Sequence, residues 1–306
     1  MLFQANPHAN KSINNWRLFF QALSLSTFAA LFSTNALSQE IKLVSAGAGV
    51  TELVLALDAA DELVAVDSTS YLPEHLATIA KLGYHRMLSA EGIMALSPTL
   101  VVGSEVMGPE TTLNVLKQAK IEVVKLPSSA DEKQLMTNID TLAQLLKRTD
   151  QAIKLKQDLH QRLEGLNKQQ QLSQQQAQPK ILFMLLQEGR GARVGGKGTA
   201  ADTIIALSGA KNIANFEGYK SLSQEGILSL QPDVILLSKR SEQSDTQTDE
   251  QTAQALLKEM PLLAHTPAGK NGHIQTLAPQ ALLGGLGISA IGAAETLAAT
   301  LLKQDQ

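Results

Sequence analysis

Short apolar runs alternate with amphipathic stretches along most of the chain. The apolar runs are rich in Val, Ile, Leu and Ala, and the stretches between them repeat apolar residues every three or four positions. Several runs are apolar at every position, which is typical of parallel strands buried on both faces. The pattern therefore predicts an α/β fold with mostly parallel sheets. The expected strands cover residues 41–45, 63–66, 100–103, 121–124, 181–186, 234–237 and 273–275.

Helices are expected between these strands. Pro73 and the pair Gly108-Pro109 stand where prolines start helices, and Ser89 and Ser223 stand where serines cap them. The expected helices cover residues 50–57, 73–81, 90–97, 200–208 and 288–302, with two more beginning after Gly108 and Ser223.

The pattern changes from Asp131 to Asn167, where apolar residues recur at helical spacing and no Gly or Pro occurs before Gly165. We expect one long helix, starting near residue 131, that crosses as a rigid spine from a first lobe to a second. A Gln-rich surface loop is expected at 169–178. The predicted organisation is a first α/β lobe at 39–145, the spine helix and Gln-rich loop at 146–178, and a second α/β lobe at 179–306.

One segment occurs twice. The 15 residues from Leu88 and the 15 from Leu222 are identical at seven positions, and each copy follows a Gly-Tyr pair. A period of about 134 residues is too long for a solenoid unit and fits two similar lobes. The first copy follows Tyr84-His85-Arg86, whereas the second follows Tyr219-Lys220-Ser221 without an arginine. This difference directs attention to Tyr84.

The first 38 residues have the features of a cleaved secretory leader. Lys11 and Arg17 are basic, 18–32 is mostly apolar, and Ala36-Leu37-Ser38 is a small-x-small cleavage site. The apolar run is too short and interrupted for a spanning helix. We expect export to the periplasm.

Composition excludes several kinds of site. The chain has no cysteine, which excludes disulfides, iron–sulfur clusters and thiol nucleophiles. Removing residues 1–38 leaves 24 basic and 29 acidic residues, a net charge of −5, which disfavours binding to nucleic acid.

Enzyme motifs are also missing. The sequence has no Gly-x-Ser-x-Gly or His-Glu-x-x-His motif. The glycine-rich stretch 191–199 resembles a phosphate loop, but glycine follows Lys197 where a hydroxyl residue is required. We interpret it as a tight turn between a strand and a helix. The few histidines include no i, i+4 pair, which disfavours a zinc or manganese site.

Tyr84 is the strongest candidate for a metal-binding side chain. It precedes a helix start, in a loop at the end of a strand–helix unit, where open α/β sheets place their ligands. A phenolate oxygen suits ferric iron, including haem iron. Its ordinary pKa of about 10 would have to fall, and a cation such as Arg86 favours the phenolate. Alternatively, Tyr84 is a half-buried loop aromatic without a ligand.

Other residues near this loop are weaker candidates. His85 should face away from Tyr84 and lie on the surface, or alternatively line a cleft and contact the ligand. Tyr71 and Met107 could line the cleft or belong to the rim or core. Tyr219 is expected to pack or to contact an anionic group of the ligand.

Glu91 and Glu225 occupy matching positions in the first turns of the two Ser-capped helices. They either stabilise the helix dipoles or form one docking carboxylate per lobe.

These motifs resemble the haem-binding periplasmic proteins of bacterial haem-uptake ABC transporters. The resemblance rests on Gly-Tyr-x-Arg-x-Leu-Ser-Ala-Glu-Gly from Gly83, Gly-Thr-Ala-Ala-Asp at 198–202 and Gly-Tyr-Lys-x-Leu-Ser at 218–223. It covers almost all of the chain after the leader. It implies a class III periplasmic binding protein, in which one long helix joins two α/β lobes. The lobes of this class move little on binding.

The resemblance also implies roles for single residues. Tyr84 matches the axial ligand of haem iron, and Arg86 matches the arginine that contacts the tyrosine or a propionate. Arg240 falls near a second-lobe arginine that contacts haem, and Tyr219 and Lys197 are further candidates for propionate contacts. Glu91 and Glu225 match glutamates that dock on an inner-membrane permease.

The expected cargo is therefore haem b, carried by a monomer without enzyme activity to an inner-membrane ABC permease. Some members of the family that the chain resembles hold two stacked haems through a second-lobe histidine. No histidine occurs between His160 and His265 here, so the resemblance implies a single haem. Two alternatives stay open: a cobalamin or ferric-siderophore carrier of the same class, and a secreted haem-processing enzyme.

Overall fold

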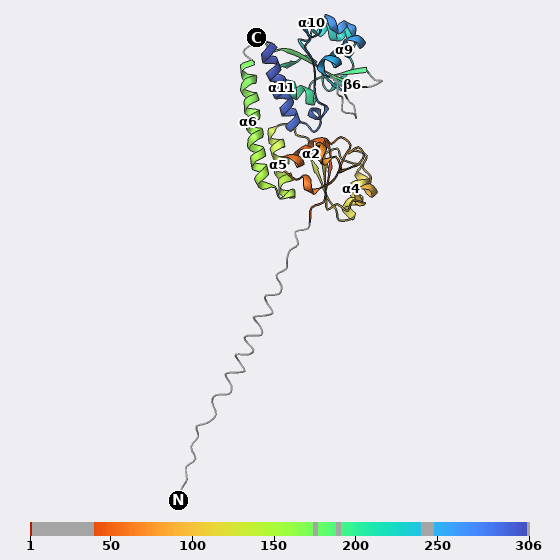
Figure 1. The fold of residues 1–306 in the computed structure, drawn as a ribbon, viewed down its shortest axis with the longest axis vertical. Helices are drawn as coiled ribbons and strands as arrows, with labels where there is room; N and C mark the ends of the chain where they lie inside the picture. Colours follow the sequence, from red (N-terminus) through yellow and green to blue (C-terminus); the bar gives the residue numbers. More distant parts are fainter. Residues whose placement is uncertain (2–39, 174–176, 188–190, 240–247, 305–306) are drawn as a thin grey trace. The chain divides into compact units, whose positions relative to one another are not determined.

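The computed structural model describes Met1 and residues 40–173, 177–187, 191–239 and 248–304 (Figure 1). Residues 41–306 form one compact unit, separate from residues 1–40. The predicted leader, apart from Met1, lies outside the described residues, and so does Arg240.

The first lobe contains a five-stranded parallel sheet in the order β3-β2-β1-β4-β5. Helices cover both of its faces, α2 and α5 on one and α3 and α4 on the other. The strand order reverses between β1 and β4, which is where open α/β sheets place ligands. The bounds are β1 Leu43–Ala46, α2 Ala48–Ala56, η1 Ala60–Glu62, β2 Leu63–Val66, η2 Glu74–Leu76, β3 Ala80–Lys81, α3 Ala90–Met94, β4 Leu100–Ser104, α4 Glu110–Gln118, β5 Glu122–Leu126 and α5 Glu132–Leu146.

The second lobe contains a mixed sheet in the order β11-β10-β6-β7-β9, with β8 beside β6. β7 and β9 are antiparallel to their neighbours, and the other pairs are parallel. Along β6, Ile181 and Phe183 enter one apolar cluster while Leu182 and Met184 enter another, so both faces are buried. The bounds are α6 Thr149–Ser173, β6 Lys180–Gln187, β7 Gly191–Gly195, α7 Ala200–Leu207, β8 Lys211–Asn212, β9 Tyr219–Lys220, α8 Gln224–Leu230, β10 Val234–Lys239, α9 Asp249–Glu259, η3 Pro261–His265, α10 Pro267–Asn271, β11 Ile274–Thr276, η4 Pro279–Leu282 and α11 Ile288–Gln304.

One long helix, α6, joins the lobes as predicted, but the segment predicted to form it contains a second helix, α5. α5 ends at Lys147, which adopts the left-handed conformation (φ 55°, ψ 43°), and α6 begins two residues later. The salt bridges Lys156–Asp140 (2.5 Å) and His160–Glu132 (2.7 Å) show that α5 and α6 run antiparallel. The expectation of one helix from about residue 131 is therefore wrong.

α6 alone joins the lobes. At its start, Arg148 donates to the Asp58 carbonyl (3.1 Å) and the Glu62 carboxylate (2.5 Å) of the first lobe. Further along, Arg162 forms a bidentate pair with Glu295 of α11 (2.9 and 2.8 Å). A helix of 25 residues is about 37 Å long, enough to reach both sheets. Figure 1 shows α6 running beside α11.

Three smaller expectations are also wrong. The helix predicted over 73–81 is only the short η2, and the end of the segment is extended, since Ala80 and Lys81 pair with β2 as strand β3. The stretch 191–199 is not one tight turn, since 191–195 pairs with β6 as strand β7. The Gln-rich segment continues α6 as far as Ser173, where a loop had been expected.

Candidate functional site

The Tyr84 loop lies at the carboxyl edge of the first sheet, between β3 and α3. Two neighbouring loops hold it through backbone hydrogen bonds. Ser68 N–H donates to the Gly83 carbonyl (3.3 Å), and Gly108 N–H donates to the His85 carbonyl (2.9 Å). The loops that follow β2, β3 and β4 therefore meet at this edge, as the topology of a parallel sheet requires.

Tyr84 and Arg86 are both accessible in this loop. The Tyr84 side chain is 36% exposed, and Arg86 is exposed as well. Within the described part of the chain, neither the Tyr84 hydroxyl nor the Arg86 guanidinium has a hydrogen-bond or ion-pair partner. Both groups are available to a ligand.

His85 is buried, contrary to the expectation of a surface residue. His85 is only 9% exposed, and its Nδ1 lies 3.0 Å from Oδ2 of Asp67. The expectation assumed an extended segment, but Met87 N–H donates to the Tyr84 carbonyl (2.7 Å) and turns the chain. His85 therefore points into the lobe while Tyr84 stays at the surface. The two rings remain in contact, with centroids 4.4 Å apart and planes inclined by 56°.

Asp67, directly after β2, anchors this arrangement. It is 0% exposed, and its carboxylate accepts five hydrogen bonds. The donors are Gly47 N–H (2.9 Å) and Ser70 Oγ–H (2.5 Å) to Oδ1, and Thr69 N–H (3.1 Å), Thr69 Oγ1–H (2.6 Å) and His85 Nδ1–H (3.0 Å) to Oδ2. Burial acts to raise the pKa of Asp67, but the hydrogen bonds from His85, Ser70 and Thr69 outweigh it and lower that pKa to about 2.

Met107 does not line a cleft. It is 1% exposed and packs in the apolar cluster of α3 and α4 with Leu88 and Ile93. A methionine sulfur at this depth fills the space above Gly103, which has no side chain. Of the alternatives for Met107, the structure therefore supports the core.

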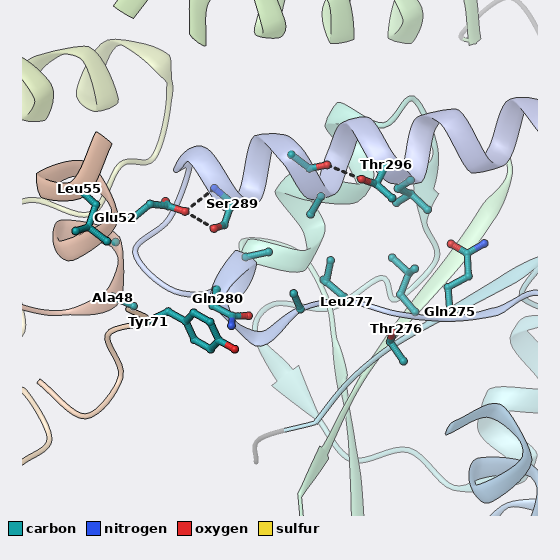
Figure 2. Close-up of a pocket in the computed structure, with 17 residues that line it drawn as sticks. Ala48, Glu52, Leu55, Tyr71, Gln275, Thr276, Leu277, Gln280, Ser289 and Thr296 are labelled. Carbon is teal, nitrogen blue, oxygen red and sulfur yellow. Dashed lines mark hydrogen bonds between the residues drawn. The ribbon is translucent and has the colours of Figure 1, made fainter. Parts of the chain in front are cut away.

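A cavity of ≈ 630 Å³ lies between α2 and the second-lobe elements β11, η4 and α11. Figure 2 shows Tyr71 at this cavity near Gln280, and Glu52 reaching Ser289. Tyr71 is 62% exposed and is the one predicted site residue, among those described, that lines the cavity. Ala48 and Gly49 also line it, so it begins beside Gly47, whose N–H binds Asp67. Tyr84 and Arg86 are not among the residues that line this cavity.

Tyr219 occupies a different environment from Tyr84. It lies in β9 and packs edge-on against Phe183, with ring centroids 6.4 Å apart. Arg193 of β7 lies over the Tyr219 ring (5.6 Å) and donates to its carbonyl (2.9 Å). Burial raises the pKa of Tyr219, and the charge of Arg193 opposes this only in part. Tyr219 therefore stays a neutral phenol, which suits packing better than metal ligation.

Lys197 lies in the loop between β7 and α7, and its side chain is exposed. Its backbone is fixed on both sides, since Lys197 N–H donates to the Phe216 carbonyl (2.7 Å) and Gly218 N–H donates to the Lys197 carbonyl (3.0 Å). The ammonium group has no partner among the described residues.

Glu91 and Glu225 are exposed in the first turns of α3 and α8, as expected. The capping serines behave alike, since Ser89 Oγ accepts from Gly92 N–H (3.3 Å) and Ser223 Oγ accepts from Gly226 N–H (3.2 Å). A hydrogen bond from its own backbone, and then one from Ser223, lower the pKa of Glu225. This carboxylate is therefore ionised at neutral pH.

Residues 43–281 match the periplasmic binding protein family. The chain belongs to the periplasmic binding protein family. Its fold agrees with the crystal structure of the periplasmic haem-binding protein HutB of Vibrio cholerae, with a TM-score of 0.77 and 41% identity over 86% of this chain and 99% of that one. The crystal structure of a periplasmic haem-binding protein from Pseudomonas aeruginosa has a TM-score of 0.75 and 34% sequence identity, covering 85% of this chain and 91% of that one. A vitamin B12-binding protein of Photorhabdus laumondii is 26% identical over 72% of this chain and 79% of its own length.

Two residues of this periplasmic binding protein escaped the sequence analysis. Asp67 is followed by Ser68, Thr69 and Ser70, and a carboxylate at the end of a buried strand before three hydroxyl residues is a recognisable signal. Arg193 gave no such signal, because its place beside Tyr219 depends on the pairing of β7 with β9.

The described residues lack two further features. They contain no group of three or more His, Cys, Asp or Glu side chains that could hold a metal ion. No helix in the same part of the chain has the length and apolar character needed to cross a membrane.

Proposed function

We propose that this periplasmic binding protein carries haem across the periplasm to an inner-membrane ABC permease. The observation that carries the proposal is the Tyr84 phenol, which is exposed, has no partner among the residues that the structure describes, and lies at the carboxyl edge of the sheet. The similarity to haem-binding proteins at 41% and 34% identity supports it. The predicted leader, residues 1–38, supports export.

In this proposal Tyr84 binds ferric haem iron as a phenolate, and Arg86 favours that charged form or pairs with a propionate. Met87, 74% exposed, and Tyr71 give the edge an apolar surface for the porphyrin. Arg193 and Lys197 are cations of the second lobe without a carboxylate partner among the described residues, so they are suited to the propionates. Arg240 and Tyr219 are proposed to contact the ligand from the same side as Arg193 and Lys197.

Glu91 and Glu225 are proposed to dock on basic sites of the permease. One exposed carboxylate stands in the first turn of an equivalent helix in each lobe. A permease built around a two-fold axis would present two matching sites.

Cobalamin remains the second candidate, because the vitamin B12-binding relatives match the chain at 24–27% identity. The higher identity to haem-binding proteins favours haem.

Titration of the protein with ferric haem tests the proposal. We expect a Soret shift and a phenolate-to-iron charge-transfer band. Removing only the hydroxyl in Tyr84→Phe should abolish that band and weaken binding by about 100-fold, or about 2.7 kcal/mol. Tyr219→Phe, which alters the matching tyrosine of the other lobe, is the control and should keep the band.

A competition assay with cobalamin decides between the candidates. Tight binding of cobalamin without any haem spectrum would overturn the haem proposal. A wild-type spectrum in Tyr84→Phe would overturn the assignment of the ligand.

A further inference from the structure

The Tyr84 loop has no regular secondary structure of its own, yet it would have to present a phenol in one geometry. Nothing described holds the Tyr84 hydroxyl, so the ring is not fixed from its outer end. An exposed side chain is free to change rotamer. Any fixation must therefore come from behind the ring.

Behind the ring lies His85, and behind His85 lies Asp67. The rings of Tyr84 and His85 are in contact (4.4 Å), and the His85 Nδ1–H donates to the Asp67 carboxylate (3.0 Å). The His85 carbonyl is also held by Gly108 N–H (2.9 Å). Both the backbone and the ring of His85 are thus fixed.

Asp67 itself is immobile. Its four other hydrogen bonds come from Gly47, Thr69 and Ser70, and Ser70 Oγ continues to Thr51 (2.7 Å) and from there to Ser45 (2.7 Å). These residues belong to β1, to the turn from β1 into α2, to α2 itself and to the loop after β2. The network therefore ties the His85 ring to the core of the lobe.

We propose that Asp67 is a positioning residue for Tyr84, acting through the His85 ring to hold the phenol ready for the iron. The inference rests on the proposed function, because it assumes that Tyr84 is the ligand. Groups that orient a metal ligand without touching the metal commonly change affinity by about 10–100-fold when they are removed.

Two variants interrupt the chain of contacts at different points. Asp67→Asn removes the carboxylate that holds the His85 ring. His85→Phe keeps a ring against Tyr84 but removes the Nδ1–H donor. Thr112→Val is the matched control, because it also deletes one buried hydrogen bond, from Thr112 Oγ1 to the Leu88 carbonyl (2.9 Å), without touching Asp67 or His85.

Each folded variant is loaded with ferric haem, and two quantities are measured: the phenolate-to-iron charge-transfer band and the rate of haem transfer to excess apomyoglobin. We expect Asp67→Asn and His85→Phe to weaken or broaden the band and to release haem about tenfold faster. Thr112→Val should match the wild type in both measurements. A general loss of packing would affect Thr112→Val as well, so this pattern separates positioning from stability.

The inference is overturned if His85→Phe and any folded Asp67→Asn protein keep the wild-type band and a release rate within about twofold of the wild type. If Asp67→Asn does not fold, His85→Phe alone decides. Tyr84→Phe is measured in parallel, so that the two proposals fail in different ways. A retained band in Tyr84→Phe would show that the ligand assignment itself is wrong, whereas a lost band there with intact bands in the other variants rejects only the role of Asp67.

Discussion

Asp67 is a fully buried carboxylate and Glu52 a half-buried one, and their pKa values are shifted in opposite directions. Asp67 accepts five hydrogen bonds at 0% exposure, and they overcome the effect of burial. Glu52 has fewer donors, so burial dominates and its pKa is raised. The number of donors around each group therefore decides the sign.

For Asp67 the lowered pKa predicts a pH-dependent contribution to stability. Because the folded pKa of about 2 lies below the ordinary value of 3.8, the stabilisation is present above pH 3.8 and is lost as the pH falls through 2. Asp67→Asn should lower the free energy of unfolding by about 2 kcal/mol at pH 7, and the difference from the wild type should shrink at pH 3. Denaturant unfolding at both pH values measures this.

The control for Asp67→Asn is Asp61→Asn, which changes an exposed aspartate of η1. Its difference from the wild type should be small at both pH values. If the loss in free energy of unfolding caused by Asp67→Asn stayed the same from pH 7 to pH 3, the pKa argument would be contradicted.

Single residues were predictable where a motif identified them. The Gly-Tyr-x-Arg motif led to Tyr84 and Arg86, and both are exposed on the predicted loop. The side chain of His85 was misplaced because alternation holds only in an extended segment, and its partner Asp67 lies 18 residues away. Contacts between such distant residues depend on the fold, and no local pattern reports them.

At the scale of elements, the seven predicted strands are all present, most of them because buried parallel strands are apolar, whereas the short strands β3, β8 and β9 were not predicted. The break between α5 and α6 was missed, since Lys147 is an ordinary helix former and neither Gly nor Pro marks the turn. The helical spacing continues across the break, so only the antiparallel packing of α5 on α6 reveals it. The β7 strand was missed because glycines at 191 and 195 resemble a turn.

The paired helices α3 and α8 lead to a prediction about transport. If Glu91 and Glu225 dock on the permease, the double variant Glu91→Lys/Glu225→Lys should slow haem transfer at least about tenfold, because like charges would then face each other. Haem affinity should not change, since neither residue lies at the Tyr84 loop. Haem uptake by proteoliposomes containing the cognate permease and its ATPase measures the effect.

The control for this pair is Glu122→Lys/Glu259→Lys. It makes the same change in net charge with one exposed glutamate in each lobe, in β5 and α9. Equal slowing by both double variants would attribute the effect to net charge and contradict docking through Glu91 and Glu225.

At the scale of the whole molecule, three contacts connect the first lobe to the segment that leads into α11 and to the first turn of α11. Gly49 and Gly284 meet backbone to backbone, since a Cβ on Gly284 would lie 2.9 Å from the Gly49 Cα. Leu286 N–H donates to the Ser129 carbonyl (2.7 Å). Together with α6, these contacts favour lobes that move little, as the resemblance implied. No sequence pattern indicated them, because glycines in loops are common.

The third contact joins the Glu52 carboxylate to Ser289, which lies at the start of α11. Glu52 Oε1 accepts a hydrogen bond from Ser289 N–H (2.8 Å) and another from the Ser289 hydroxyl. Burial raises the pKa of Glu52 although both bonds from Ser289 oppose it, so the folded protein favours the uncharged carboxyl. A raised pKa gives stability that is complete below the ordinary value of 4.5 and is lost as the pH rises through the folded pKa.

Glu52→Gln removes the charge but keeps an oxygen that accepts from Ser289. We therefore expect the variant to be more stable than the wild type at pH 8, by about 1 kcal/mol or about 2 °C in Tm, with no advantage at pH 4. Thermal unfolding of the ligand-free protein across this range measures the difference, and Glu122→Gln, an exposed glutamate of β5, should show no such trend. The opposite outcome is that Glu52→Gln loses stability relative to the wild type between pH 4 and pH 8. The charged carboxylate would then be the form that holds the lobes together, and the contact would strengthen as the pH rises.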